Sequence, residues 1–181
     1  MKLFSPTKTF IKNSNLYKFE NYIFKKYKIK FQNYLNLWKW SNKNPEKFWL
    51  LILDFFRIEF KLKGNSKVLK KNKIFIKNQF FSNYLVNYYH LIENNKTDDL
   101  AIHFFGENNF EERITYNELN LRINALSSYY LSLNIKKGDI IVGYLPNITD
   151  TIIAFLASAK IGAVWSSCSA DFGSKAVIDR F

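Results

Sequence analysis

The sequence predicts an α/β fold preceded by a mostly helical N-terminal region, and three observations carry this prediction. The last third alternates apolar strand-like runs with an amphipathic helical run, at residues 139–145, 149–161 and 163–167, which is the order of a βαβ unit. The first third has aromatic and aliphatic residues at spacings of three and four, which is typical of helices. The chain has 181 residues and is 48% hydrophobic, which is enough for one or two domains with a core.

The N-terminal region contains two predicted helices. Residues 17–34 place aromatic side chains at helical spacing and predict an amphipathic helix. Its apolar face would hold Ile23, Phe24, Tyr27, Phe31 and Tyr34. The Asn-Pro pair at residues 44 and 45 predicts the start of a second helix, because Asn is typical of the N-cap and Pro of the first helical position. This helix would run to about residue 56 and bury Phe48, Trp49, Leu51, Ile52 and either Phe55 or Phe56 as core, not as cofactor contacts.

The middle of the chain has weaker patterns. Residues 64–72 are polar and predict a loop, residues 74–81 predict a short strand or extended stretch, and residues 84–93 predict a helix. The segment Asn94–Asp99, NNKTDD, is entirely polar and lies between an apolar helix end and the next apolar strand. We therefore place the domain boundary there, with an N-terminal extension at residues 1–95 and a second domain at residues 96–181.

The second domain is predicted to begin with a strand at residues 100–105 and a loop at residues 106–112. Thr115 lies three residues before Glu118. This spacing predicts a capping box, in which the Thr hydroxyl accepts from the third backbone N–H and the Glu side chain reaches back. The helix that follows would place Leu119, Ile123, Leu126 and Tyr130 on one face.

The βαβ unit is predicted from clear punctuation. A Pro-Asn turn at residues 146 and 147 separates its first strand from the helix, and Gly162 suits the left-handed conformation that ends helices. We expect the helix to bury Ile152, Ile153, Phe155, Leu156 and Ala159. Trp165, in the second strand, is expected to fill space beneath the sheet.

Charge is divided unevenly along the chain. Residues 1–90 hold nineteen Lys and Arg against four Asp and Glu, whereas residues 91–181 hold eight against eleven. Such a basic half is compatible with nucleic acid or an anionic membrane surface. However, only four of the 27 cations are Arg, the residue that phosphate and base recognition favours. The lysines accompany many Asn, Ile, Phe and Tyr residues, as an AT-rich coding sequence produces, so we predict no nucleic-acid partner.

Several other functions are disfavoured by composition. Cys168 is the single cysteine and His90 and His103 are the two histidines, so neither an internal disulfide nor a His- or CxxC-based metal site is expected. No histidine lies near Cys168 in the sequence, which argues against a catalytic thiol, and His103 is expected to be a satisfied core residue. The N-terminus lacks an apolar signal region, and the most hydrophobic stretch, Phe48–Phe60, contains three charged residues. We therefore expect a cytoplasmic protein without a membrane partner.

Five stretches of the chain carry a family resemblance. They are KNPEKFWLLILDFFRI at Lys43–Ile58, ITYNEL at Ile114–Leu119, YLPNI at Tyr144–Ile148, KIGAVWSSCSADFG at Lys160–Gly173 and VIDRF at Val177–Phe181. In them the chain resembles the AMP-forming acyl-CoA synthetases of the adenylate-forming family. Trp165 replaces the His of the acetyl-specific branch, so the resemblance points to the acetoacetate-activating branch. It implies that residues 96–181 are the opening portion of the large N-terminal domain of the adenylate-forming fold, preceded by the helical extension.

This resemblance implies an acid–thiol ligase. The complete enzyme would convert acetoacetate and ATP to an acyl adenylate, transfer the acyl group to coenzyme A, and require Mg²⁺. The family's Ser/Thr/Gly-rich phosphate loop and its adenylating lysine are absent from these 181 residues. We therefore expect a truncated chain that is inactive alone, binds no cofactor tightly and acts with a missing C-terminal portion. Two alternatives stay open: a non-catalytic remnant or interaction module that retains the βαβ core, and a basic nucleic-acid-binding protein.

One segment of the chain is implied to touch a substrate. By the resemblance, Ser169, Ala170 and Asp171 match positions that contact coenzyme A, whereas the chain holds no catalytic or metal-ligating residue of the family. Small side chains there would let the backbone approach the nucleotide. The acetyl-specific branch has an aromatic residue and two glycines at these positions, and an inward Asp171 would repel a phosphate. The alternative is that Asp171 or Ser174 caps the next helix.

Overall fold

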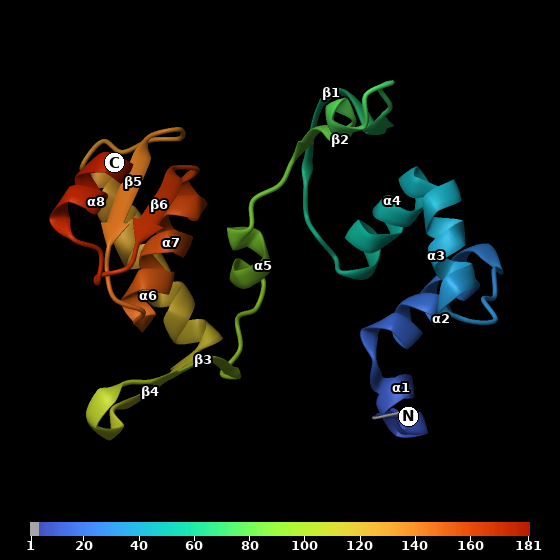
Figure 1. Cartoon of the computed structure of the whole chain (residues 1–181), viewed down its shortest axis with the longest axis horizontal. Coiled ribbons are helices and arrows are strands. Elements are labelled where there is room, and N and C mark those ends of the chain that lie inside the picture. Colours follow the sequence, from blue (N-terminus) through green and yellow to red (C-terminus); the bar gives the residue numbers. More distant parts are fainter. Residues whose placement is uncertain (1–3) are drawn as a thin grey trace. The chain divides into compact units, whose positions relative to one another are not determined.

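The structure is a computed structural model that describes residues 4–181. It contains two compact units, Met1–Val86 and Asn87–Phe181 (Figure 1). Each unit has its own core. The domain boundary expected between residues 95 and 96 stays a prediction. In the structure the short helix before it, α5 (Tyr89–Glu93), packs within the second unit.

The first unit is built from helices followed by one β-hairpin. The helices are α1 (Lys8–Asn13), α2 (Asn15–Tyr27), α3 (Tyr34–Lys43) and α4 (Pro45–Phe55). Strands β1 (Lys61–Lys70) and β2 (Gln79–Leu85) pair antiparallel, with the 3₁₀ turn η1 (Phe75–Lys77) between them. The core of this unit consists of Phe19, Ile23, Leu37 and Leu51.

Helix α2 corrects the first sequence prediction in length and in orientation. It ends at Tyr27 because Lys28 adopts the left-handed conformation, with φ of 58° and its N–H bonded to the carbonyl of Phe24. The buried side chains are Phe19 and Ile23, whereas Phe24 and Tyr27 are exposed. The ring of Phe19 lies 5.2 Å from that of Phe55 on α4. The contact with α4 therefore selects the face that the sequence spacing alone left undecided.

Helix α4 begins with Pro45 at its first position, as predicted. Asn44 occupies the N-cap position, but its side chain donates to the carbonyl of Trp40 at 3.0 Å and so closes α3. Leu51 is fully buried, and Phe48, Ile52 and Phe55 pack around it. The prediction was wrong for Trp49, which is exposed, and of the two alternatives Phe55 and Phe56 the structure selects Phe55.

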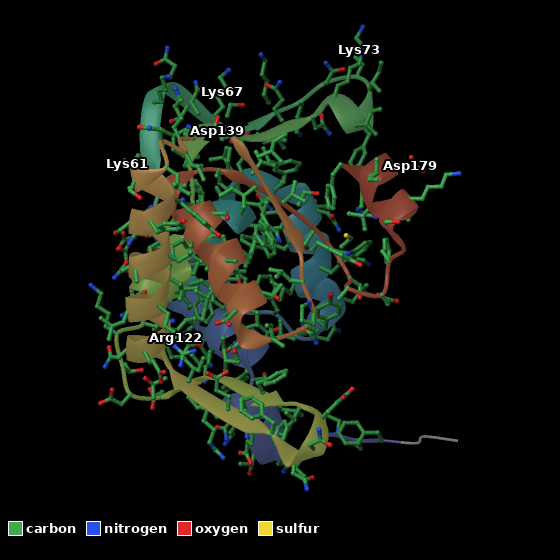
Figure 2. All side chains as sticks on the ribbon, turned by 90° about the vertical axis from the view of Figure 1, so that its left-hand side faces the viewer. Lys61, Lys67, Lys73, Arg122, Asp139 and Asp179 are labelled. Atoms are coloured by element: carbon green, nitrogen blue, oxygen red, sulfur yellow. The ribbon has the colours of Figure 1, made fainter. Side chains whose placement is uncertain are left out.

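The predicted loop at residues 64–72 is instead largely strand β1. Gly and Asn are depleted in strands, but pairing across the hairpin outweighs this preference. Leu69 pairs with Phe80, and Lys67 pairs with Ser82. The lysines of this hairpin project from the ribbon, as Lys61, Lys67 and Lys73 show (Figure 2). Because β2 extends to Leu85, the helix expected at residues 84–93 shortens to α5.

The second unit contains a hairpin and the predicted βαβ unit. Its elements are β3 (Leu100–Phe105), η2 (Glu107–Asn109), β4 (Glu111–Thr115), α6 (Tyr116–Ser132), β5 (Ile140–Tyr144), α7 (Thr149–Ile161), β6 (Val164–Cys168) and α8 (Ser174–Arg180). Strands β5 and β6 pair parallel, from Ile140 opposite Val164 to Tyr144 opposite Cys168. The loop expected after β3 is shorter than predicted, because residues 111–115 pair with β3.

Helices α6 and α7 enclose the core of the second unit. The core residues are Tyr89, Ile114, Leu119, Ile123, Ile153, Leu156 and Ala157. Thr115 caps α6 as predicted, since its hydroxyl accepts from the N–H of Glu118 at 3.2 Å. The other half of the capping box is not formed, because the Glu118 carboxylate accepts from Arg122 at 2.6 Å.

The buried face of α7 differs in part from the prediction. Ile153 and Leu156 are buried as expected, but Ile152 is 39% exposed and Phe155 is 36% exposed. The Phe155 ring lies 6.1 Å from that of Tyr88. Nearly every residue from 152 to 159 is apolar or small, so periodicity indicates a helix without choosing its inner face.

Gly143 and Trp165 depend on each other. A Cβ at Gly143 would lie 2.6 Å from the Cη2 and Cζ2 atoms of Trp165. This distance is too short for two carbon atoms that are not bonded, so a larger residue at position 143 would clash with the indole. The indole therefore lies over the glycine of the neighbouring strand. This contact agrees with the expected role of Trp165 in filling space at the sheet.

Candidate functional site

The candidate site is the segment that follows β6. Ser169, Ala170 and Asp171 are consecutive and all exposed, and they lie between β6 and α8 (Figure 1). This is the edge of a parallel pair where the strands reach their carboxyl ends, the usual place for ligands in α/β sheets. The segment is therefore accessible, and its small side chains leave its backbone open to approach.

One side chain from the neighbouring strand holds this segment. The hydroxyl of Tyr144, the last residue of β5, lies 2.9 Å from the carbonyl oxygen of Ala170 and 2.8 Å from that of Phe172. The segment also closes on itself, because the N–H of Phe172 donates to the carbonyl of Ser169 at 3.2 Å. Tyr144 lies in the YLPNI stretch, yet the sequence assigns it no role, because its partners are 26 and 28 residues away.

The capping alternative for this segment is wrong in the structure. Gly173 occupies the N-cap position of α8 and has no side chain with which to cap. Ser174 is the first helical residue, and Asp171 lies two residues before the N-cap. Neither side chain accepts a bond from the start of α8, so capping does not explain their presence here.

The cysteine and the histidines are separate from one another. Cys168 is a buried free thiol. His90 pairs with Glu93 at 3.1 Å, and His103 pairs with Glu111 at 2.5 Å. His103 therefore lies at the surface of the β3–β4 hairpin, which corrects the expectation that it belongs to the core. Its contact with Glu111, followed by that of Arg113, lowers the pKa of that carboxyl.

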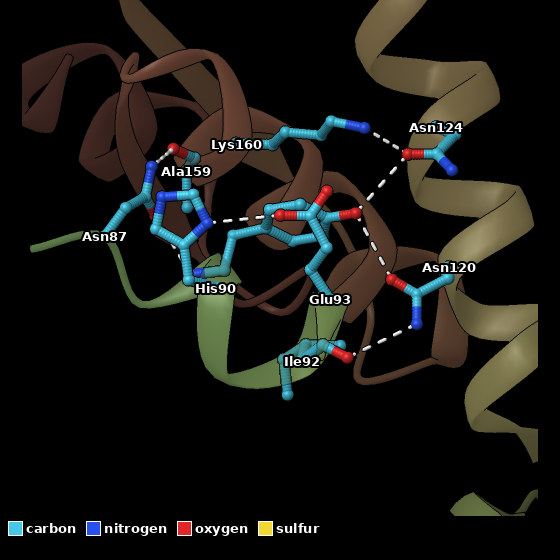
Figure 3. Close-up of polar contacts among 9 residues, drawn as sticks. Asn87, His90, Ile92, Glu93, Asn120, Asn124, Ala159 and Lys160 are labelled. Atoms are coloured by element: carbon cyan, nitrogen blue, oxygen red, sulfur yellow. Dashed lines mark hydrogen bonds and ion pairs between the residues drawn. The ribbon is translucent and has the colours of Figure 1, made fainter. Parts of the chain in front are cut away.

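A polar network fastens α5 to α6 and α7 (Figure 3). The buried hydroxyl of Tyr89 lies 3.2 Å from the amide oxygen of Asn120 and 3.3 Å from that of Asn124. Lys160 donates to Asn124, and Asn87 donates to the carbonyl of Ala159 at 2.7 Å. Burial raises the pKa of Tyr89. We interpret this network as structural, since its members are directed toward each other.

A second polar cluster joins β4 to the start of α7. The Glu112 carboxylate accepts from the hydroxyl of Thr149 at 2.5 Å and from Arg122 at 2.9 Å. These two bonds, that of Thr149 first, lower the pKa of Glu112. Arg122 also binds Glu118, so one guanidinium links the hairpin and α6. No local sequence pattern indicates this cluster, because its members come from three elements.

A cavity of about 590 Å³ in the first unit is lined by residues of α2, of α4 and of the segment that follows α4. Among them, Lys26 and Asp54 pair with each other at 2.5 Å. Within residues 4–181, no group of three or more His, Cys, Asp or Glu is placed to hold a metal ion. The helices described here include none with the length and apolarity to cross a membrane.

Comparison with known proteins agrees with the fold. The model of the family described as AMP-binding enzyme matches residues 91–180. Acetoacetyl-CoA synthetase of Xenopus tropicalis is 31% identical over 166 residues, which cover 90% of this chain and 25% of that protein. Acetoacetyl-coenzyme A synthetase of Rhizobium meliloti is 27% identical over 179 residues, which cover 99% of this chain and 27% of that protein.

A solved structure extends the similarity over the whole chain. The acetoacetyl-CoA synthetase from Streptomyces lividans matches with a TM-score of 0.88 and 26% identity, covering 100% of this chain and 28% of that one. The chain thus spans about a quarter of the length of the curated relatives it matches. It has the α/β fold of the N-terminal part of that synthetase, and its residues 91–180 match the AMP-binding enzyme family.

Proposed function

We propose that this chain forms the N-terminal quarter of a ligase that joins acetoacetate to coenzyme A at the expense of ATP. The observation that carries the proposal is the match of the entire chain to an acetoacetyl-CoA synthetase structure at a TM-score of 0.88. The curated relatives with similar coverage have the same name. A cytoplasmic location is part of the proposal.

The proposed reaction has two steps. A carboxylate is a poor electrophile, so it first attacks the α-phosphate of ATP, which forms an acyl adenylate and releases pyrophosphate. The thiol of coenzyme A then attacks the acyl carbon, and AMP leaves. We assign the binding of ATP and Mg²⁺ to the remaining three quarters of the ligase, because the six glycines of this chain are isolated and offer no phosphate cradle. The 181-residue chain alone is expected to be inactive.

In this proposal the segment Ser169–Asp171 contacts coenzyme A. Its exposure at the carboxyl end of β6 supports this role, since a nucleotide can approach a backbone with small side chains. Ala170 adds only a methyl group, and Ser169 adds a hydroxyl that can donate or accept. The exposed carboxylate of Asp171 would repel a phosphate, so it is expected to point away from the bound nucleotide.

The proposal includes no nucleic-acid partner. Lysines occur on α1 to α4, on β1 and at η1, so nearly every element of the first unit carries some. This distribution supports a compositional origin, because a nucleic-acid site gathers its cations on one face. A non-catalytic remnant would have the same fold, and the experiment below separates it from a ligase.

Replacement of Ala170 by Trp in the complete ligase tests the segment. An indole at this exposed position would exclude the nucleotide sterically. We expect the KM for coenzyme A to rise by at least about tenfold, or 1.4 kcal/mol. Acetoacetate-dependent ATP–pyrophosphate exchange should stay near the wild-type rate, because the first step needs no coenzyme A.

Ala125→Trp is the matched control, because Ala125 is exposed on α6 and receives the same bulk elsewhere. It should leave both steps unchanged. An unaltered KM in Ala170→Trp would remove the segment from the coenzyme A site. Absence of both steps in the complete wild-type protein would favour the non-catalytic remnant.

A further inference from the structure

The hydroxyl of Tyr144 connects the end of one parallel strand to the loop after the next. Tyr144 is the register partner of Cys168, so the two strands end side by side. The loop then turns back, and the carbonyls of Ala170 and Phe172 lie 2.9 and 2.8 Å from the phenolic oxygen. A hydroxyl has one proton, so it donates to one carbonyl at a time and is shared between them.

These contacts are the main polar restraint on the loop. Among residues 4–181, Tyr144 supplies the side-chain hydrogen bonds that reach the segment 169–173. Two backbone bonds also hold it: the N–H of Phe172 donates to the carbonyl of Ser169, and the N–H of Val177 in α8 donates to the carbonyl of Gly173. Helix α8 begins without a side-chain cap. Loss of the phenolic hydroxyl would thus leave a five-residue connection with one internal bond.

The direction of the carbonyls fixes the direction of the N–H groups. All peptide bonds in the described part of the chain are trans, and in a trans peptide the C=O and N–H point in opposite directions. The carbonyl of Ala170 shares its peptide with the N–H of Asp171, and that of Phe172 shares its peptide with the N–H of Gly173. Neither N–H donates to another group within residues 4–181. Both therefore point away from Tyr144, available to an acceptor on a ligand.

We infer that Tyr144 is a positioning residue for coenzyme A, an inference that rests on the proposed function. Its hydroxyl, shared between the carbonyls of Ala170 and Phe172, keeps these carbonyls turned toward β5 and so turns two backbone donors to the opposite side. Tyr144 does not touch the nucleotide. It acts by keeping the segment in the orientation that the nucleotide meets, which saves the cost of ordering the loop on binding.

Tyr144→Phe removes the hydroxyl and retains the ring. Tyr129→Phe is the matched control, because Tyr129 is exposed on α6 and its hydroxyl has no hydrogen-bond partner among the described residues. The first measurement uses the 181-residue chain and needs no ligand. Backbone ¹⁵N order parameters of residues 169–173 should fall in Tyr144→Phe and stay at the wild-type values in Tyr129→Phe. Unchanged order parameters in Tyr144→Phe would overturn the inference.

The second measurement uses the complete ligase and separates the two steps. We expect Tyr144→Phe to raise the KM for coenzyme A about three- to tenfold, the range of one lost hydrogen bond. Pyrophosphate exchange should keep its wild-type rate, whereas a general structural defect would lower it. An unchanged KM overturns the inference.

The two proposals fail in distinguishable ways. If Ala170→Trp raises the KM and Tyr144→Phe does not, the segment contacts coenzyme A without help from Tyr144, and only the inference falls. If Ala170→Trp has no effect on the KM for coenzyme A, the proposed contact between the segment and coenzyme A is refuted. A loss of order in Tyr144→Phe would then describe a loop restraint without a link to coenzyme A, and the inference falls too.

Discussion

Replacement of Ile153 by Ala measures how much the core between α6 and α7 stabilises the second unit. Ile153 is 4% exposed and belongs to the cluster that includes Ile123 and Leu156. The change removes three carbon atoms, worth about 0.8 kcal/mol each in transfer from water, and the cavity left behind adds to this. We expect a loss of about 3 kcal/mol in the free energy of unfolding, within the range of about 2 to 5 kcal/mol for such changes.

Ile152→Ala is the matched control, since it is the same change one residue earlier on the same helix. Ile152 is 39% exposed, and Ala has the higher helix propensity, so its cost should stay below about 1 kcal/mol. The first unit has its own core, so a probe of the whole chain would mix two transitions. Hydrogen exchange of the slowest amides of α6 and α7 reports the second unit alone.

The expected exchange is about a hundredfold faster in Ile153→Ala than in the wild type, which corresponds to about 3 kcal/mol. Exchange in Ile152→Ala should rise less than tenfold. Equal effects of the two changes would refute the assignment of the inner face of α7. A larger effect of Ile152→Ala would mean that the helix is rotated about its axis relative to the structure.

Two polar contacts lead to further predictions. Glu112→Gln should destabilise the second unit at neutral pH. Because Thr149 and then Arg122 lower the pKa of the folded carboxyl, its contribution is fully present above the ordinary value of 4.5 and is lost as the pH falls through the folded pKa. The difference from the wild type in the opening free energy of the second unit, measured by hydrogen exchange of the α6 and α7 amides, should therefore shrink in acid, and a constant difference would contradict the ion pair. Tyr89→Phe removes the buried hydroxyl that reaches Asn120. It should lower the free energy of unfolding of the second unit by about 1 to 2 kcal/mol, measured by the same exchange method. An unchanged free energy would mean that water bonds to the amide oxygen of Asn120 equally well.

The confirmed predictions rest on signals that lie within a few residues of one another. The hydroxyl of Thr115 needs to reach an N–H only three residues ahead. Gly162 takes φ of 77° to end α7, as a residue without a Cβ does readily. The strand–helix–strand order around them then specifies a parallel pair, since a crossover of this length suits no hairpin.

The predictions that failed depended on partners distant in sequence. Strand β1 has a polar composition and exists because Leu69 and Lys67 meet Phe80 and Ser82 across the hairpin. The inner face of α2 depends on the contact of α2 with α4 through Phe19. On α7, the nearly continuous apolar run permits several inner faces, and contact with α6 selects the one that contains Ile153.

The candidate site also combines features predicted from neighbouring residues with contacts between residues distant in sequence. The sequence by itself determined that Ser169, Ala170 and Asp171 follow the last strand of a βαβ unit. The order of apolar and polar runs along the chain is enough to place this segment after that strand. Only the tertiary structure placed the hydroxyl of Tyr144 on the carbonyls of this segment, and only it brought Glu112 to Thr149. Hydrogen bonds between residues 26 and 37 positions apart require the sheet and helices to pack together, and no local pattern encodes them.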